Sequence, residues 1–192
     1  MIQRVCLKLC DCFIDTGIIT SEMKDLYCYG MYQGVVLFFN LLTALLIGLF
    51  LDSVMEVILY LAAYIPLRIY AGGYHAETPG RCYIFSVILI TAILLAIRFF
   101  AISDVVCCIG MILAFAVIFI IAPMEDKNKP FTTKEQFFFK KQIRYLLFIE
   151  TFIFIIAYFI NYTTLSTCIF AAFITMVFML ILGHIKNKYR KN

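Results

Sequence analysis

The chain has 192 residues, of which 64% are hydrophobic and 15% are charged. Proteins average about 45–50% apolar residues, so this composition excludes an ordinary soluble domain and indicates a protein of the lipid bilayer. Lys and Arg outnumber Asp and Glu by 16 to 12, and these charges cluster between nearly uncharged apolar runs. We expect a single membrane domain over residues 1–192.

Residues 1–34 are expected to form a leader that lies at the membrane interface. In the first half of this leader, apolar residues recur at helical spacing with charged residues between them, at Ile2, Val5, Leu9, Cys12 and Phe13. This pattern is typical of an amphipathic helix that lies in the plane of the interface.

Six apolar runs follow, and each is long enough, or nearly so, to cross a hydrocarbon core about 30 Å thick as a helix. They cover residues 35–51, 54–69, 82–102, 105–122, 145–160 and 164–183. The second run is short and contains Pro66, so it is expected to tilt or kink. The predicted fold is an all-α integral membrane protein with a six-span bundle over 35–183 and a basic tail over 184–192.

The basic residues alternate between the connections. Fifteen of the 16 Lys and Arg residues fall in the first 34 residues, the 68–81 and 123–144 connections, and the tail, with Arg98 as the exception. The positive-inside rule therefore predicts a multi-pass protein of the cell membrane with both termini in the cytoplasm. The same basic segments suit contact with anionic lipid.

Two acidic residues fall inside predicted spans, where ionisable groups are costly. Glu56 and Glu150 lie near the ends of their runs. We therefore expect both carboxyl groups to reach the interface instead of forming a proton relay.

The eight cysteines show no disulfide-framework spacing, and most are expected to be small buried hydrophobes. They are Cys6, Cys10, Cys12, Cys28, Cys82, Cys107, Cys108 and Cys168. No His lies near Cys10 and Cys12, so no metal site is expected there.

Polar residues concentrate in the connection between the second and third runs. Thr78 followed by Pro79 is a helix-start signature, which places Cys82 in the first turn of the third span. A thiol there experiences the positive end of the helix dipole, and the adjacent Arg81 adds a positive charge. Both effects favour the thiolate form of Cys82.

His75 precedes Cys82 by seven residues, across a Gly-rich turn that can fold the imidazole back towards the sulfur. Two interpretations remain open from the residues alone. A Cys and a His are sufficient for nucleophilic catalysis, but a buried Cys beside an interfacial His that anchors a loop is the commoner arrangement.

The same connection resembles the signature of accessory gene regulator B (AgrB) proteins, the quorum-sensing endopeptidases of Gram-positive bacteria. The likeness lies in Arg68, the Ala-Gly-Gly-Tyr-His-Ala segment at 71–76, Thr78-Pro79 and Cys82. The six runs, the amphipathic leader, Ala122-Pro123 and the Lys-Asn-Lys-Pro segment at 127–130 extend the likeness over the whole chain.

This resemblance implies that His75 and Cys82 are the catalytic dyad of a membrane cysteine endopeptidase. The implied substrate is an AgrD-type propeptide, whose acidic C-terminal tail is removed while the remainder becomes a cyclic thiolactone or lactone. A homodimer is also expected, with no metal, cofactor or nucleic-acid partner. The chain has no Gly-x-x-x-x-Gly-Lys loop, which agrees with chemistry that needs no ATP.

The remaining candidate residues each have two interpretations. Arg68 and Gln33 are candidate oxyanion donors or substrate contacts, although Arg68 also suits an interface anchor. Lys127 and Lys129 suit attraction of an acidic peptide tail, but also an ordinary positive-inside loop.

Two other functions compete with the peptidase. Six spans suit a small transporter, and they also suit a non-catalytic subunit of a membrane complex. Against transport, the polar residues concentrate at one interface instead of along a path through the midplane, and no broken-helix repeat is evident.

The predicted orientation can be tested by labelling single introduced cysteines with a membrane-impermeant maleimide. Asp52→Cys, Asp104→Cys and Asn161→Cys should react in intact cells, whereas Lys127→Cys and Lys140→Cys should react only after permeabilisation. Labelling of Lys127→Cys in intact cells would contradict the charge count.

Overall fold

The computed structural model describes residues 2–74, 78–99, 103–125 and 132–189, and these residues form helices joined by short connections. The predicted all-α fold is confirmed. In chain order the helices are α1 (Ile2–Asp15), the short η1 (Ser21–Met23), α2 (Lys24–Phe50), α3 (Val54–Ala71), α4 (Pro79–Phe99), α5 (Asp104–Ile121), α6 (Thr133–Phe159) and α7 (Thr163–Tyr189).

Six helices in the described part of the chain are long and apolar enough to cross a membrane, namely α2 to α7. The shortest of them have 18 residues, which corresponds to about 27 Å of helix and matches the thickness of a hydrocarbon core. The predicted number of spans is confirmed, and α1 precedes them as a separate amphipathic helix.

Several helices are longer than the apolar runs that predicted them. α2 begins at Lys24, α6 begins at Thr133, and α7 continues to Tyr189. Apolar runs mark where side chains suit hydrocarbon, but the helical backbone continues into the polar flanks. At α6 the start is set by a capping box, in which Thr132 accepts from the Glu135 N–H and the Glu135 carboxylate accepts from the Thr132 N–H.

The second predicted span stays helical through Pro66 and ends only at Ala71. Pro66 therefore lies inside the helix without ending it. Gly72, with a φ of 72°, then ends α3. α3 is thus one continuous element that leads directly into the connection that carries the candidate residues.

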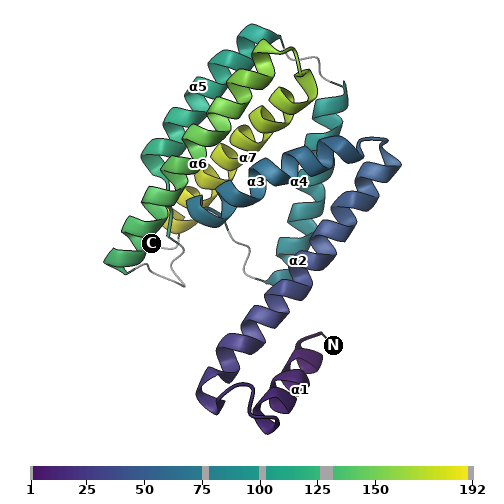
Figure 1. Cartoon of the computed structure of the whole chain (residues 1–192), viewed down its shortest axis with the longest axis vertical. Coiled ribbons are helices and arrows are strands. Elements are labelled where there is room, and N and C mark those ends of the chain that lie inside the picture. Colours follow the sequence, from purple (N-terminus) through teal and green to yellow (C-terminus); the bar gives the residue numbers. More distant parts are fainter. Residues whose placement is uncertain (1, 75–77, 100–102, 126–131, 190–192) are drawn as a thin grey trace.

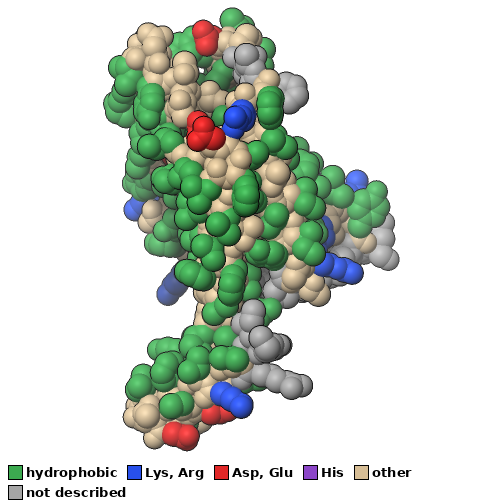
Figure 2. Space-filling view, turned by 90° about the vertical axis from the view of Figure 1, so that its right-hand side faces the viewer, with side chains coloured by type: hydrophobic (Ala, Val, Ile, Leu, Met, Phe, Trp, Pro, Cys, Tyr) green, Lys and Arg blue, Asp and Glu red, His purple; other side chains and the backbone are tan. Residues whose placement is uncertain are grey.

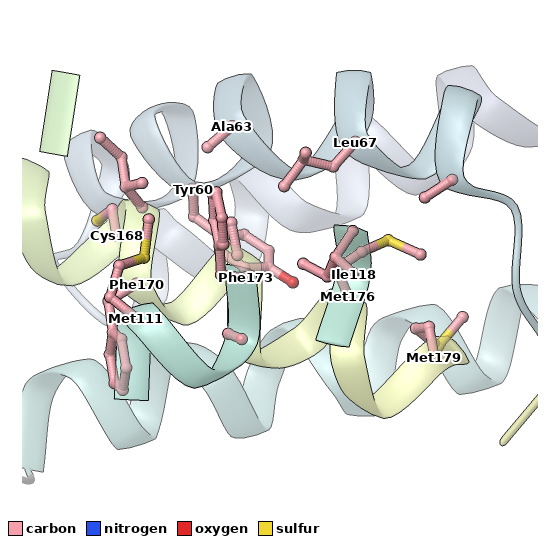
Figure 3. Packing of buried hydrophobic residues seen from close by; sticks show 14 of the residues in the cluster. Tyr60, Ala63, Leu67, Met111, Ile118, Cys168, Phe170, Phe173, Met176 and Met179 are labelled. Atoms are coloured by element: carbon pink, nitrogen blue, oxygen red, sulfur yellow. The ribbon is translucent and has the colours of Figure 1, made fainter. Parts of the chain in front are cut away.

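α7 is the centre of the bundle and packs against α3, α5 and α6 (Figure 1). In the most apolar stretch of α7, 61% of the residues are buried, compared with 6% in α4 and 11% in α2. The core side chains include Tyr60 and Leu67 from α3, Ile118 from α5, and Phe173 and Met176 from α7, all fully buried (Figure 3). α7 therefore provides the surface on which the other helices are placed.

α2 and α4 form the outer part of the molecule. They pack against each other, and the hydroxyl groups of Thr43 and Tyr83 share a 2.6 Å hydrogen bond between them. The first half of α2 projects away from the bundle with α1 folded back along it (Figure 1). Hydrophobic side chains cover most of the face seen in Figure 2, as expected for a surface in contact with lipid.

Glu150 is a correction to the sequence analysis. It lies in the interior of α6 and is only 7% exposed, and one of its carboxyl oxygens is buried without a hydrogen-bond partner among the described residues. The expectation that it reaches the interface is wrong. Glu150 shares one helical stripe with the buried Leu147 and Phe154, so it faces the bundle.

The central position of α7 predicts a large difference between two phenylalanines on that helix. Phe173 is 0% exposed and Phe178 is 45% exposed. Phe173→Ala should lower the free energy of unfolding by about 3–5 kcal/mol, because it leaves a cavity in the core. Phe178→Ala should change it by less than about 0.5 kcal/mol. Unfolding titrations in mixed micelles measure both, and equal losses would contradict the packing.

Candidate active site

Cys82 lies in the first turn of α4, as predicted from Thr78 and Pro79. The Thr78 carbonyl accepts a 3.0 Å hydrogen bond from the Cys82 N–H, and the Thr78 hydroxyl accepts a 3.4 Å bond from the Arg81 N–H. Thr78 therefore acts as the N-cap, with Pro79 at the first helical position. The Cys82 thiol is half-buried and sits at the positive end of the helix dipole.

The surroundings of Cys82 come from α3 and from its own helix. Ser86, one turn along α4, donates to the Cys82 carbonyl at 2.9 Å. Tyr64 of α3 interacts electrostatically with both Arg68 and Cys82, and its ring stacks on Tyr60 at a centroid distance of 5.5 Å. The Tyr64 ring, held by stacking on Tyr60, thus belongs to the part of α3 that is electrostatically linked to the start of α4.

Arg68 binds the turn that follows α3. Its two terminal nitrogens donate to the carbonyl oxygens of Gly72 and Tyr74, so one planar guanidinium group joins the end of the helix to the loop. These carbonyls lie beyond the helix, where they have no partner within α3. Arg68 is therefore a structural residue of the turn, and it is half-buried.

Two further backbone hydrogen bonds fix this turn from outside α3. The Tyr74 N–H donates to the Met179 carbonyl of α7, and the Met124 N–H, from the connection after α5, donates to the Ala71 carbonyl, each at 2.9 Å. We call Arg68, Gly72, Gly73 and Tyr74, together with Met124 and Met179, the turn clamp. It ties the connection before α4 to the central helix.

Only glycine fits the two positions in the middle of the turn clamp. Gly72 and Gly73 have φ values of 72° and 103°, which side chains rarely adopt. A Cβ atom at Gly72 would collide with the Met124 carbonyl, and one at Gly73 would lie 3.0 Å from both Arg68 Nη1 and the Met179 oxygen. The Gly-Gly pair therefore permits close approach as well as the turn.

The ring of Tyr74 brings the end of the turn clamp to α4. It contacts Phe85 at a centroid distance of 5.5 Å, and the Lys186 ammonium group of α7 lies 5.4 Å above it. Phe85 is one turn after Cys82, and His75 follows Tyr74 directly, so the chain returns to the first turns of α4 at the residue before His75. His75, Lys127 and Lys129 lie outside the described residues.

The sequence profile of accessory gene regulator B (AgrB) matches residues 6–180 of the chain. The chain belongs to the AgrB family. It is 28% identical to AgrB-like protein 2 of Clostridium perfringens strain 13 and 27% identical to an AgrB-like protein of strain SM101, each over 123 residues. Both relatives are named by their likeness to AgrB.

Each of these alignments covers 60% of this chain and 58% of the relative, so the chain spans less than two thirds of the length of the relatives it matches. No solved structure matches the chain. The family match contains α2 to α6 and most of α7, including Cys82 and the whole turn clamp.

The structure places the other predicted site residues in this AgrB chain at different distances from Cys82. Arg68 lies in the turn clamp, one helical turn after Tyr64 on α3. Gln33 is exposed on α2, about 15 Å along the helix axis from Thr43, which meets the first turn of α4 through Tyr83. A role for Gln33 therefore requires a substrate that extends along α2.

The sequence analysis missed Met124 and Met179, and it included Tyr74 only as part of the 71–76 segment, without a role. They act through backbone atoms or aromatic packing, for which residue type gives little signal. Gly183 gives a partial indication of this contact in the sequence, because a Cβ atom at this position would lie 2.9 Å from the Tyr74 nitrogen. A glycine one helical turn after Met179 thus marks where α7 is approached closely.

The turn clamp can be tested with two glycine substitutions. Gly72→Ala should lower the free energy of unfolding by at least about 1 kcal/mol, because the φ is unfavourable and the Met124 carbonyl is in the way. It should also speed hydrogen exchange at the Tyr74 amide. Gly80→Ala is the control, because nothing lies within 4 Å of its Cβ position. Equal stability of the two variants would contradict the clamp.

Proposed function

We propose that this AgrB-family chain is a membrane cysteine endopeptidase that removes the C-terminal tail of an AgrD-type propeptide. One observation supports the proposal above all, namely that Tyr74, at the end of the turn clamp, packs against Phe85 of α4. The residue before His75 packs against Phe85, one turn from a half-buried Cys82 at a helix N-terminus. This arrangement suits a nucleophile and a base drawn from two adjacent segments.

In the proposed reaction, His75 accepts the proton of the Cys82 thiol and the thiolate attacks the scissile carbonyl carbon. The C–N bond then breaks, and the imidazolium donates its proton to the departing amine of the tail. The remaining peptide is bound to Cys82 as a thioester. A Cys or Ser side chain within that peptide attacks the thioester, closes the ring and releases the Cys82 sulfur.

Cyclisation requires that the peptide nucleophile reaches the thioester before water does. Cys82 is half-buried, and one turn along α4 the rings of Tyr74 and Phe85 pack together, which reduces the access of water to this part of the helix. An intramolecular nucleophile held nearby gains a high effective concentration, so the ring closes without nucleotide hydrolysis.

The basic residues define where the substrate approaches. Arg81 and Lys134 lie in the first turns of α4 and α6, Lys140 lies two turns further along α6, and Lys186 lies near the end of α7 above the Tyr74 ring. These positions belong to the end of the bundle that carries the turn clamp. We assign this end to the cytoplasm and to contact with anionic lipid. Together with Lys127 and Lys129, the basic residues at this end of the bundle attract the acidic tail of the propeptide.

We further propose that the protein acts as a homodimer.

The dyad separates this function from transport or a purely structural role. In proteoliposomes with the propeptide encoded beside its gene, Cys82→Ala and His75→Ala should each abolish tail removal while membrane insertion is unchanged. Cys12→Ala, at an exposed cysteine on α1, is the matched control and should retain activity. Undiminished processing by Cys82→Ala would contradict the peptidase and favour a small transporter or a non-catalytic subunit.

The nucleophile can also be identified by trapping. The wild-type protein should form a covalent adduct with the N-terminal fragment of the propeptide, and hydroxylamine at neutral pH should release it, because thioesters yield to this reagent and amides do not. Cys82→Ser should show little or no turnover, since a serine hydroxyl does not form an anion as readily as a thiol. Mass spectrometry detects both species.

A further inference from the structure

Three cysteines meet where α1 packs against the first half of α2, away from the candidate active site. Cys6 and Cys10 lie one turn apart on α1 and are 4% and 0% exposed, and Cys28 faces them from α2. The peptidase mechanism uses none of them. Among the described residues, no group of three metal-binding side chains could hold a metal ion.

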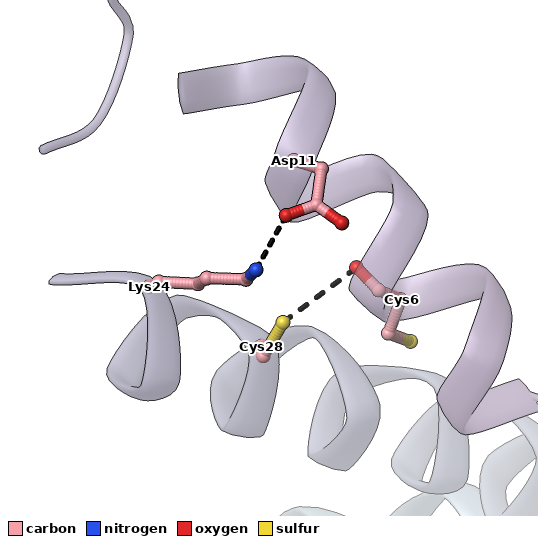
Figure 4. Close-up of polar contacts among 4 residues, drawn as sticks. All are labelled: Cys6, Asp11, Lys24 and Cys28. Atoms are coloured by element: carbon pink, nitrogen blue, oxygen red, sulfur yellow. Dashed lines mark hydrogen bonds and ion pairs between the residues drawn. The ribbon is translucent and has the colours of Figure 1, made fainter. Parts of the chain in front are cut away.

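Two polar contacts fix the register of α1 against α2 (Figure 4). The Lys24 ammonium group pairs with the Asp11 carboxylate at 2.5 Å. One turn further along α2, the Cys28 sulfur lies 3.7 Å from the Cys6 carbonyl oxygen. The two helices therefore run antiparallel, and Cys28 is held opposite the turn of α1 that contains Cys6 and Cys10.

The geometry places Cys28 next to Cys10. The Cys28 sulfur lies 3.7 Å from the Cys6 carbonyl oxygen, and in a helix that carbonyl points along the axis towards the N–H of Cys10, four residues on. Cys10 is fully buried in this packing, so a small approach of Cys28 would bring the two sulfurs to the bond length of about 2.0 Å. Cys6 is placed differently, because its own sulfur lies on the far side of the residue from Cys28 in Figure 4. Cys6 instead lines an apolar groove of about 560 Å³ between α1 and α2.

We propose that Cys10 and Cys28 are a disulfide-forming pair, through which a low-molecular-weight disulfide such as oxidised glutathione reversibly fastens α1 to α2. The inference is independent of the peptidase proposal. In the described part of the chain α1 packs on α2, and the Asp11–Lys24 ion pair that joins them is partly exposed. A covalent bond would therefore convert a weakly held helix into a fixed one.

The chemistry balances with one oxidant molecule. Cys28, the half-buried partner, attacks oxidised glutathione to give a Cys28–glutathione mixed disulfide and one molecule of glutathione. The Cys10 sulfur then attacks the Cys28 sulfur, forms the Cys10–Cys28 bond and displaces a second glutathione. Both protein thiols are oxidised, one disulfide is reduced to two thiols, and the two protein protons leave on the glutathione products.

The test uses the full-length protein in proteoliposomes, treated with oxidised glutathione and digested without reduction for mass spectrometry. We expect a linked peptide pair that contains Cys10 and Cys28, two hydrogen atoms lighter than the separate peptides and lost on treatment with dithiothreitol. Cys10→Ser should leave Cys28 as the glutathione adduct. Cys12→Ser is the control and should retain the linkage, since Cys12 is exposed.

Three results would overturn the proposal. These are a Cys6–Cys28 link in place of Cys10–Cys28, a Cys28–Cys28 link between two chains, and the absence of any link under conditions that convert Cys12 to its glutathione adduct. Because the linked peptides are sought in the wild-type protein, the result does not depend on whether the Cys10→Ser variant folds.

The pH dependence of ring closure gives a second readout. Burial, together with the neighbouring Cys28 thiol, raises the pKa of the Cys10 thiol to about 11, so its thiolate is scarce at neutral pH. Starting from the isolated Cys28–glutathione adduct, closure should accelerate about tenfold per pH unit from pH 7 to beyond pH 9. An ordinary thiol would level off near pH 8.5, and such a plateau would contradict attack by Cys10.

Discussion

The turn between α3 and α4 must satisfy its backbone hydrogen bonds within the protein. Ala71 and Gly73 are buried in the protein, and an unpaired N–H or C=O group in such surroundings is costly. The helix cannot supply partners beyond Ala71, so Arg68 donates to two carbonyls and the Met179 carbonyl accepts the Tyr74 N–H. The position of everything that follows, including the start of α4, depends on this pairing.

This constraint explains why α7 is the most deeply buried helix. α7 offers a carbonyl to the turn through Met179, and one turn later Gly183 leaves room for the loop backbone. The same helix contacts α3, α5 and α6 through its fully buried side chains. The geometry near Cys82 is thus supported by the core of the protein instead of by the flexible surface of a loop.

Features with local causes were predictable from the sequence. The number of spans follows from apolar length, and the start of α4 follows from Thr78 and Pro79, because an N-cap is decided by a few adjacent residues. The turn clamp was not predictable, since Tyr74 and Met179 are far apart in the chain and interact through backbone atoms. Arg68 was recognised as important, but its binding of the turn was not foreseen.

The burial of Glu150 shows a second limit of sequence analysis. α6 is apolar on most sides over its membrane portion, so hydropathy does not show which face turns inward. Only the contacts with α3 and α7 reveal that the stripe through Leu147, Glu150 and Phe154 is the buried one. In a membrane protein the rotation of a helix is a tertiary property, whereas its existence is a local one.

The hydrogen bond between Thr43 and Tyr83 has a mechanical consequence. Tyr83 is the residue after Cys82, and Thr43 lies on α2, whose other end carries α1 well outside the bundle. Because α2 is one continuous helix from Lys24 to Phe50, it joins α1 at one end to the neighbour of Cys82 towards the other. The position of α1 and the position of the first turns of α4 are thus mechanically linked through one helix and one hydrogen bond.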